Sequence, residues 1–164
     1  MKILIVEDDP SRMRFYRDAF ARLMPEAMVD IVTSFGGYLR NAADVNYDAY
    51  VMNDTIADDR QAFWDIAPLI QKRFPDAVLL HNSSNMDPDY IRNVERLAKI
   101  RFARGPDGKV VTCNKQFPVI LEFLRTMVVG KEDAKQKPTL ERSPACQSMR
   151  FHTEPRVAFR CCRP

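Results

Sequence analysis

Acidic side chains directly follow the first predicted strand, where they could bind a divalent cation. Residues 2–6 are rich in Ile, Leu and Val, which is typical of a strand buried on both faces, and Glu7, Asp8 and Asp9 follow at once. Carboxylates at the end of a central strand are costly unless they face solvent or a cation, and such oxygen ligands suit Mg²⁺. In the alternative interpretation, Asp9 caps a helix that starts at Pro10, and Glu7 and Asp8 are solvated.

Polar residues also follow three later apolar stretches. They lie at 53–54, 82–84 and 114–115. The carboxyl ends of parallel strands meet at one edge of a sheet, and ligands of open α/β sheets bind beyond these ends. We therefore expect the three polar clusters to converge with residues 7–9 in a single site.

The elements that must position this site alternate along the chain. Apolar residues at helical spacing predict helices at 10–24, 34–43, 58–74, 88–100 and 118–128, with Pro68 as a kink or restart in the third. Strands are predicted at 2–6, 28–33, 48–54, 77–80 and 110–113. This alternation predicts an α/β fold: a five-stranded parallel sheet with right-handed crossovers and helices on both faces.

Composition and charge indicate a globular domain followed by a tail. Of the 164 residues, 46% are hydrophobic and 29% are charged, as in ordinary globular proteins. Residues 130–164 hold eight Lys or Arg against four Asp or Glu, a net charge of +4, while the remainder carries −1. Because apolar periodicity stops at Gly130, we expect a folded domain at 1–129 and a basic, disordered tail at 130–164. Contact with nucleic acid is expected only through this tail, if at all.

The sequence indicates no membrane segment and no zinc site. No apolar run approaches the roughly 20 residues of a membrane span, and the N-terminus lacks the order of a signal peptide, so we expect a cytoplasmic protein. Cys113 lies in an apolar stretch, whereas Cys146, Cys161 and Cys162 lie in the tail. Their spacing is not typical of metal ligands, and reduced thiols are expected.

Four stretches of the sequence together resemble the receiver domain of two-component response regulators. They are ILIVEDDP, YDAYVMND, the polar end of VLLHNSS, and CNKQFP, and they cover about residues 1–129 in the family's order. The resemblance implies a flavodoxin-like, receiver-like fold. In that family, two acidic residues and an acceptor Asp bind Mg²⁺. A histidine kinase transfers a phosphoryl group to the acceptor, and a Ser or Thr and a Lys contact the new phosphate.

The resemblance assigns roles to particular residues of this chain. Glu7 and Asp8 become the acidic pair, with Asp8 the better direct ligand. Lys115 matches the family's lysine, although a Gln replaces the Pro that usually follows it. The Ser or Thr position falls on Asn82 by strand register, or on Ser83 by spacing from the third strand.

The acceptor position carries Asn53 instead of Asp. An amide is neutral, is a poor nucleophile and cannot become an acyl phosphate. Asp54 is adjacent, but successive strand residues point to opposite faces, so Asp54 could accept phosphate and bind metal only if the strand end is bulged or turning. With two acids instead of three, Mg²⁺ binding is expected to be weakened, and Lys115 becomes the natural ion-pair partner of Asp8.

The resemblance therefore implies a receiver or a pseudo-receiver. Such a module would signal by docking to a protein partner, for example a histidine kinase. The expected docking surface is the fourth helix, fifth strand and fifth helix, which receivers commonly use.

An enzymatic alternative rests on a second resemblance. A smaller group of receiver-like proteins, thought to process cyclic phosphates, has a similar acidic loop followed by Arg, matched here by Arg12. Its fourth strand ends in Val-x-x-His, matched by residues 78–81. That group's Asp-His-Asp on the third strand falls on 53–55, where both acids are missing. A Mg²⁺-dependent phosphoesterase would then rest on the following residues: Glu7, Asp8, Asp54 and His81.

Overall fold

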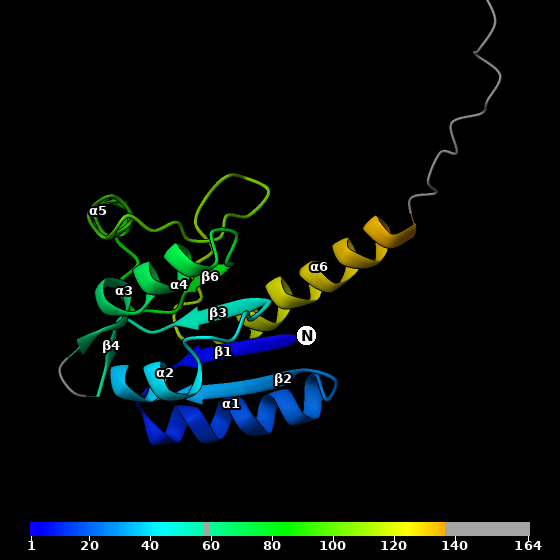
Figure 1. The fold of residues 1–164 in the computed structure, drawn as a ribbon. Coiled ribbons are helices and arrows are strands. Elements are labelled where there is room, and N and C mark those ends of the chain that lie inside the picture. Colours follow the sequence, from blue (N-terminus) through cyan, green and yellow to red (C-terminus); the bar gives the residue numbers. More distant parts are fainter. Residues whose placement is uncertain (58–59, 137–164) are drawn as a thin grey trace, which may run out of the picture.

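A parallel sheet of four strands forms the centre of the molecule (Figure 1). The computed structural model describes residues 1–57 and 60–136, and side chains as far as Met127. The strands of this sheet are β1 (Lys2–Val6), β2 (Met28–Val32), β3 (Ala49–Met52) and β6 (Leu79–His81). Their order is β2-β1-β3-β6, and every pairing is parallel. The predicted α/β fold with a parallel sheet is confirmed.

Helices cover both faces of this sheet, as the sequence predicts. The helices are α1 (Pro10–Leu23), α2 (Phe35–Asn41), α3 (Ala62–Asp65), α4 (Ala67–Arg73), α5 (Pro88–Ala98) and α6 (Phe117–Gln136). Because strand side chains alternate between faces, Ile3 and Ile5 pack with residues of α1 and α6, whereas Leu4 and Val6 pack with residues of α2 to α5. These four β1 side chains are fully buried, which stabilises the fold by roughly 1.5–3 kcal/mol each.

The predicted fifth strand at 110–113 does not form a continuous strand in the described part of the chain. Two short segments lie beside β6 instead, and the turn at 105–108, which contains two glycines, reverses the chain between them. Gly108 adopts a φ of 76°, which glycine tolerates without strain. The backbone bridges that hold these segments are Leu79–Phe102 and His81–Thr112, both parallel, and Arg104–Val110, antiparallel.

The segment predicted as one helix at 58–74 is divided. A hairpin of β4 (Thr55–Ile56) and β5 (Arg60–Gln61) precedes two short helices, α3 and α4. Pro68 is the second residue of α4, where a missing N–H is tolerated, so the predicted restart near this proline is confirmed. Residues 58–59, where the single helix was expected to begin, lie outside the described residues.

Helix α6 is longer than predicted. It continues past the expected end at Val128 to Gln136 and runs out beyond the sheet (Figure 1). A glycine such as Gly130 costs about 1 kcal/mol in a helix, which does not stop this one. The helix therefore crosses the predicted domain boundary between 129 and 130. The rest of the predicted tail, with three of the cysteines, lies outside the described residues, whereas Cys113 is buried and free.

No helix within the described ranges, 1–57 and 60–136, combines the length and apolar character that a membrane span requires.

Candidate functional site

The carboxyl ends of β1, β3 and β6 place three polar residues in one row. Met52 pairs with Val6 on one side and with His81 on the other. Backbone hydrogen bonds continue this ladder by one residue on each strand. The next row across the sheet therefore consists of Glu7, Asn53 and Asn82. All three are buried, and alternation along the strands directs them to the face covered by α1 and α6.

Asn53 faces the acidic loop, residues 7–9, and forms a hydrogen bond with Glu7. Its Nδ2 atom donates to Oε1 of Glu7 at 3.1 Å and to the carbonyl oxygen of Thr55 at 3.0 Å. Its Oδ1 atom accepts the backbone N–H of Asp54 at 2.9 Å. The position aligned with the family's acceptor thus carries an amide that donates a hydrogen bond to the acidic pair.

Asp54 is held on the other side of the sheet, by α5. Its Oδ2 atom accepts a hydrogen bond from the hydroxyl of Tyr90 at 2.9 Å, and its backbone carbonyl accepts the N–H of Ala62 at 2.8 Å. Tyr90 packs against the cluster of apolar residues under α2 to α5, and burial and the Asp54 carboxylate raise its pKa. The strand end therefore does not turn Asp54 toward the acidic loop.

Glu7 is fully buried, and burial raises the pKa of its carboxyl group. Three neighbours partly offset this effect. The backbone N–H of Asp9 donates to Oε1 at 3.2 Å, the Nη1 atom of Arg12 lies 3.7 Å from Oε2, and the charge of Lys115 also lowers the pKa. Among the described residues, Oε2 has no hydrogen-bond partner. Arg12 is thus the one cation of residues 1–57 and 60–136 that lies within 4.0 Å of the buried carboxylate.

Asp9 caps α1, as one of the two sequence interpretations predicts. Its Oδ1 atom accepts the backbone N–H groups of Ser11 at 2.8 Å and Arg12 at 3.3 Å, and these bonds lower the pKa of Asp9. The cap places Arg12 in the first turn of α1, directly after the acidic loop. The other part of that interpretation is wrong for Glu7, which is buried and not solvated, whereas Asp8 is half-buried.

The expected magnesium ligands Glu7, Asp8 and Asp54 are not brought together. Within residues 1–57 and 60–136, no group of three or more His, Cys, Asp or Glu side chains is arranged to hold a metal ion. Mg²⁺ requires near-octahedral oxygen coordination. Asn53 turns an N–H toward Glu7 instead of an oxygen toward a cation. The residues present therefore do not fit a three-carboxylate magnesium site.

Lys115 lies close enough to the acidic loop to affect it electrostatically. Its charge lowers the pKa of Glu7 and of Asp9. Lys115 and Asn114 have φ values of 57° and 40°, so the chain makes a left-handed turn where it leaves Cys113. In the described part of the chain, no ion pair within 4.0 Å joins Lys115 to Asp8. The expected ion pair between Lys115 and Asp8 is therefore absent from these residues, and Arg12 pairs with Glu7 and Asp9 instead.

Asn82 and Ser83 occupy consecutive buried positions after β6. Asn82 lies in the row with Asn53, and its Nδ2 atom donates to the hydroxyl oxygen of Tyr16 on α1 at 3.1 Å. The Oγ atom of Ser83 accepts the backbone N–H of Asn85 at 3.1 Å, within its own loop. Strand register thus places Asn82 in the row, with Ser83 one residue beyond it.

Two tyrosines of the site are not evident from the sequence as polar partners. Tyr16 falls on the apolar face of its helix pattern, and the pattern for 88–100 places other residues inward. Each carries a hydroxyl to a site residue: Tyr16 to Asn82, and Tyr90 to Asp54. An aromatic residue with a polar tip at the first turns of a helix is the signal that could have indicated both.

His81 lies on the opposite face of the sheet from Glu7. Its ring stacks on Phe63, with ring centroids 5.0 Å apart, and meets the edge of Phe102 at 5.2 Å. Both ring nitrogens are buried and have no hydrogen-bond partner in the described residues, and burial lowers the pKa of His81 to about 4. His81 is therefore not placed with Glu7 and Asp8, as phosphoester cleavage by these residues would require.

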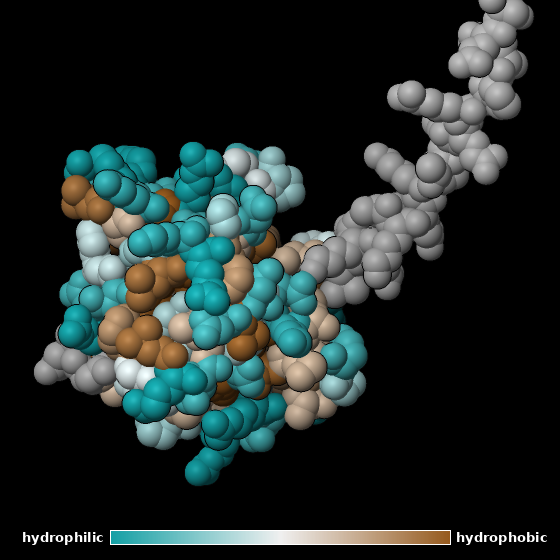
Figure 2. Space-filling model, viewed as in Figure 1, coloured by the Kyte–Doolittle hydropathy of each residue, from teal (hydrophilic) through white to brown (hydrophobic). Residues whose placement is uncertain are grey.

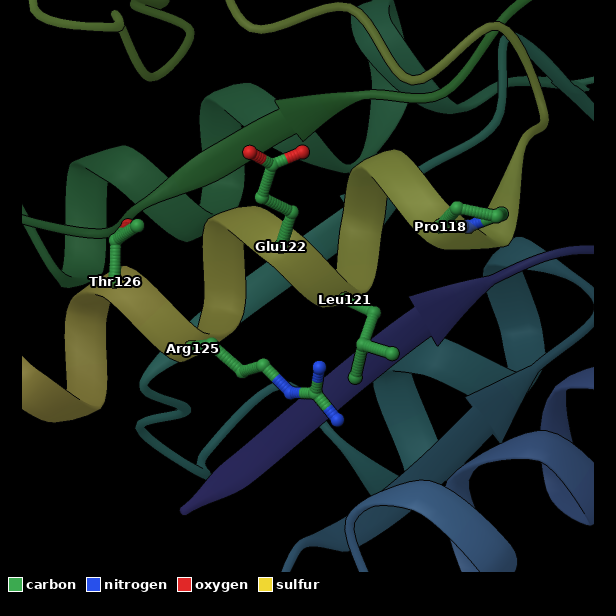
Figure 3. Close-up of a pocket in the computed structure, with 5 residues that line it drawn as sticks. All are labelled: Pro118, Leu121, Glu122, Arg125 and Thr126. Atoms are coloured by element: carbon green, nitrogen blue, oxygen red, sulfur yellow. The ribbon is translucent and has the colours of Figure 1, made fainter.

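A surface depression lies elsewhere, on α6. It has a volume of about 620 Å³ and is lined by Pro118, Leu121, Glu122, Arg125 and Thr126 (Figure 3). Glu122 and Arg125 extend to different sides of the helix in this view. Because no residue of the row lines this depression, it is separate from the candidate site.

Comparison with solved structures identifies the fold. The signal receiver domain of a DNA-binding response regulator from Colwellia psychrerythraea matches with a TM-score of 0.60 at 14% identity, over 79% of this chain and 98% of that one. A CheY-like receiver domain protein from Methanospirillum hungatei matches with a TM-score of 0.56 at 16% identity, over 83% and 96% of the two chains. This chain has a receiver-like fold. No protein-family model matches the sequence, and no curated protein matches it either.

A third structure with the receiver fold contains a magnesium ion. The receiver domain of a sensor histidine kinase from Pseudomonas aeruginosa, with a magnesium ion coordinated in its active-site cleft, has a TM-score of 0.55 at 17% identity, over 77% of this chain and 93% of that one. At such identities the likeness concerns the receiver fold alone.

Proposed function

We propose that this protein is a pseudo-receiver, a signalling module with the receiver fold that acts by binding a protein partner and accepts no phosphoryl group. The observation that supports this proposal is the hydrogen bond from Asn53 to Glu7. An amide in this position offers no nucleophilic oxygen for an acyl phosphate. The adjacent carboxylate, Asp54, is engaged with Tyr90 on the other side of the sheet.

The charges around Glu7 support a site that is balanced without a cation. Two carboxylates 4 Å apart repel by about 4 kcal/mol at an effective dielectric constant of 20, so a receiver with three acids needs Mg²⁺ to offset their charge. Here Asn53 contributes an N–H donor and Arg12 a positive charge to the same buried carboxylate. The pocket is therefore expected to keep one conformation whether or not Mg²⁺ is present.

The receiver-like fold and the amide at the acceptor position support signalling by docking. The solved structures with this fold include the receiver domains of a DNA-binding response regulator and of a sensor histidine kinase. By analogy, the partner of this chain is another signalling protein. Without a phosphoryl acceptor, the amount of complex would be set by the abundance of the partner, or by a ligand that changes the affinity of the partner.

Incubation with acetyl phosphate and Mg²⁺ tests the proposal. The intact mass of the full chain should not increase by a phosphoryl group. Asn53→Asp restores a carboxylate that faces Glu7 and provides a matched variant for the same assay. A mass gain in the unaltered chain that disappears in Asp54→Ala would show an active receiver and overturn the proposal.

A further inference from the structure

Helix α2 and the pair α3 and α4 lie side by side on one face of the sheet and are bridged near both ends. At one end, the guanidinium of Arg60 lies over the Phe35 ring, 5.3 Å from its centroid, and its Nη1 atom lies 3.3 Å from Oδ1 of Asp65. At the other end, Nη1 of Arg73 lies 2.8 Å from Oδ1 of Asp44. Between these two bridges, both helical segments therefore run in the same direction.

Two exposed leucines lie between the bridges, one on each helical segment. Leu39 follows Phe35 by one turn of α2 and is 50% exposed. Leu69 precedes Arg73 by one turn of α4 and is 39% exposed. Figure 2 shows apolar residues gathered among hydrophilic ones in the region where α2, α3 and α4 lie in Figure 1.

Each leucine has a cation beside it without an acidic partner. Arg40 follows Leu39 on α2, and Lys72 lies three residues after Leu69, on the same side of α4. Both cations are exposed, and within residues 1–57 and 60–136 neither forms an ion pair of 4.0 Å or less. Together, Leu39, Arg40, Leu69 and Lys72 form what we call the α2–α4 face.

The α2–α4 face is separate from the docking surface that the resemblance to receivers implies. That surface comprises α5, the segment beside β6, and α6, which contribute no residue to this face. One exposed leucine is common on a protein surface. Two leucines on neighbouring helices, each beside an unpaired cation, provide a surface that is both apolar and basic.

We propose that the α2–α4 face binds an acidic amphipathic segment of the partner protein, with apolar side chains over Leu39 and Leu69 and carboxylates at Arg40 and Lys72. The inference rests on the proposed docking function and names a surface and the chemistry of the partner. Because neither cation is paired with an acid of the described residues, a carboxylate can bind each without displacing one.

The same charges disfavour other occupants. The segment 130–164 of this chain has a net charge of +4, and a second copy would present the same two cations, so both would be repelled. A membrane with anionic lipids would attract the cations, but helices that bind membranes bury an apolar face along their whole length. Here the apolar part of the face consists of two side chains.

Selection from a library of random peptides displayed on phage, with the full chain as bait, tests this inference. The enriched peptides should combine Asp or Glu with aliphatic or aromatic residues. A synthetic peptide of the enriched sequence should bind two double variants, Leu39→Ser, Leu69→Ser and Arg40→Glu, Lys72→Glu, at least about tenfold more weakly than the unaltered chain. The first variant loses apolar contact, and the second repels carboxylates. Fluorescence anisotropy of the labelled peptide measures the affinities.

Each double variant has a matched control. Leu23→Ser, Leu97→Ser removes exposed leucines from α1 and α5, and Arg17→Glu, Arg22→Glu reverses two exposed charges on α1. Both controls should bind the peptide as tightly as the unaltered chain does. Melting curves from circular dichroism show that each variant is folded at the temperature of the binding measurement.

Five results would overturn the inference. They are no enrichment, enrichment of peptides without acidic residues, undiminished binding to the two test variants, equal weakening in test and control variants, and binding to phosphatidylserine vesicles that is lost in Leu39→Ser, Leu69→Ser. The last result would assign the face to a membrane. None of them changes the acetyl phosphate result, so failure of this face and failure of the pseudo-receiver assignment can be told apart.

Discussion

The Nδ2 atom of Asn53 lies 3.1 Å from Oε1 of Glu7, so a hydrogen-bond donor and a buried carboxylate share the position where a phosphoryl-accepting site would hold two acids and a cation. This bond joins the ends of β1 and β3. It couples the chemistry of the site to the stability of the central strands.

Asn53→Asp should destabilise the protein in the absence of divalent cations. The variant replaces a donor with a carboxylate that repels Glu7, at a cost of roughly 1–3 kcal/mol. Mg²⁺ should recover part of this loss, because the variant pocket supplies the missing third acid. Urea denaturation with and without Mg²⁺ measures both effects. Asn46→Asp, at an exposed position, is the control and should show neither. Equal stability of Asn53→Asp and the unaltered chain would contradict the assigned bond.

Arg12→Gln should destabilise the protein most at neutral and higher pH. The pKa of Glu7 is already raised by burial, and loss of the nearby guanidinium raises it further. A group whose folded-state pKa is raised stabilises the fold below its unfolded-state pKa, and this contribution is lost as the pH rises through the folded-state pKa. The deficit of the variant should therefore be about 1 kcal/mol at pH 7 and smaller near pH 4. Arg14→Gln, on an exposed part of α1, should show no such trend in denaturation curves at the two pH values.

Tyr90→Phe should cost about 1–3 kcal/mol of stability, because it leaves a part-buried carboxylate without its hydroxyl donor. The Oδ1 atom of Asp54 has no partner among the described residues, so loss of the bond to Oδ2 removes its one side-chain donor there. A double-mutant cycle with Asp54→Ala measures the pair, and the two losses should not add. Additive losses would show that Tyr90 stabilises α5 by packing alone.

His81 should make the fold sensitive to acid. Its pKa falls from 6.5 to about 4 on folding, so between these values the unfolded chain binds a proton that the folded chain does not. Stability should therefore fall as the pH is lowered from 6.5 toward 4, by roughly 3 kcal/mol in total. His81→Leu should remove most of this dependence in thermal unfolding at several pH values. His152→Gln, which changes the other histidine of the sequence, is the control. A dependence of the same size in His81→Leu would assign it to another group.

The order of elements can be predicted from this sequence because apolar periodicity reports burial directly. Residues 2–6 and 10–24 show this clearly, since a short apolar run is typical of a buried strand and apolar residues at helical spacing are typical of a helix. The predicted fifth strand does not form as one continuous strand in the described part of the chain, and the reason is physical. The run 110–113 has strand character, but the turn at 105–108 first carries the chain back on itself, and the position beside β6 is shared by two short segments.

Side-chain direction at the site can be predicted only in part. Alternation along β3 correctly separates Asn53 from Asp54. The partner of Asp54 cannot be predicted, because Tyr90 lies 36 residues further along the chain and contacts Asp54 only after α5 has packed. Likewise, charge alone favours Lys115 as the neutralising cation, whereas the cap at Asp9 sets the first turn of α1 and places Arg12 beside Glu7.

Helix α6 is the longest helix of the described residues. At 1.5 Å per residue, the 20 residues of α6 span about 30 Å, and side chains of its first part, such as Ile120 and Leu124, are buried under the sheet. A tilt of about 10° at that first part would move the far end by about 5 Å over this length. Small changes in packing between α1 and α6 would thus be magnified into displacements large enough for another molecule to sense.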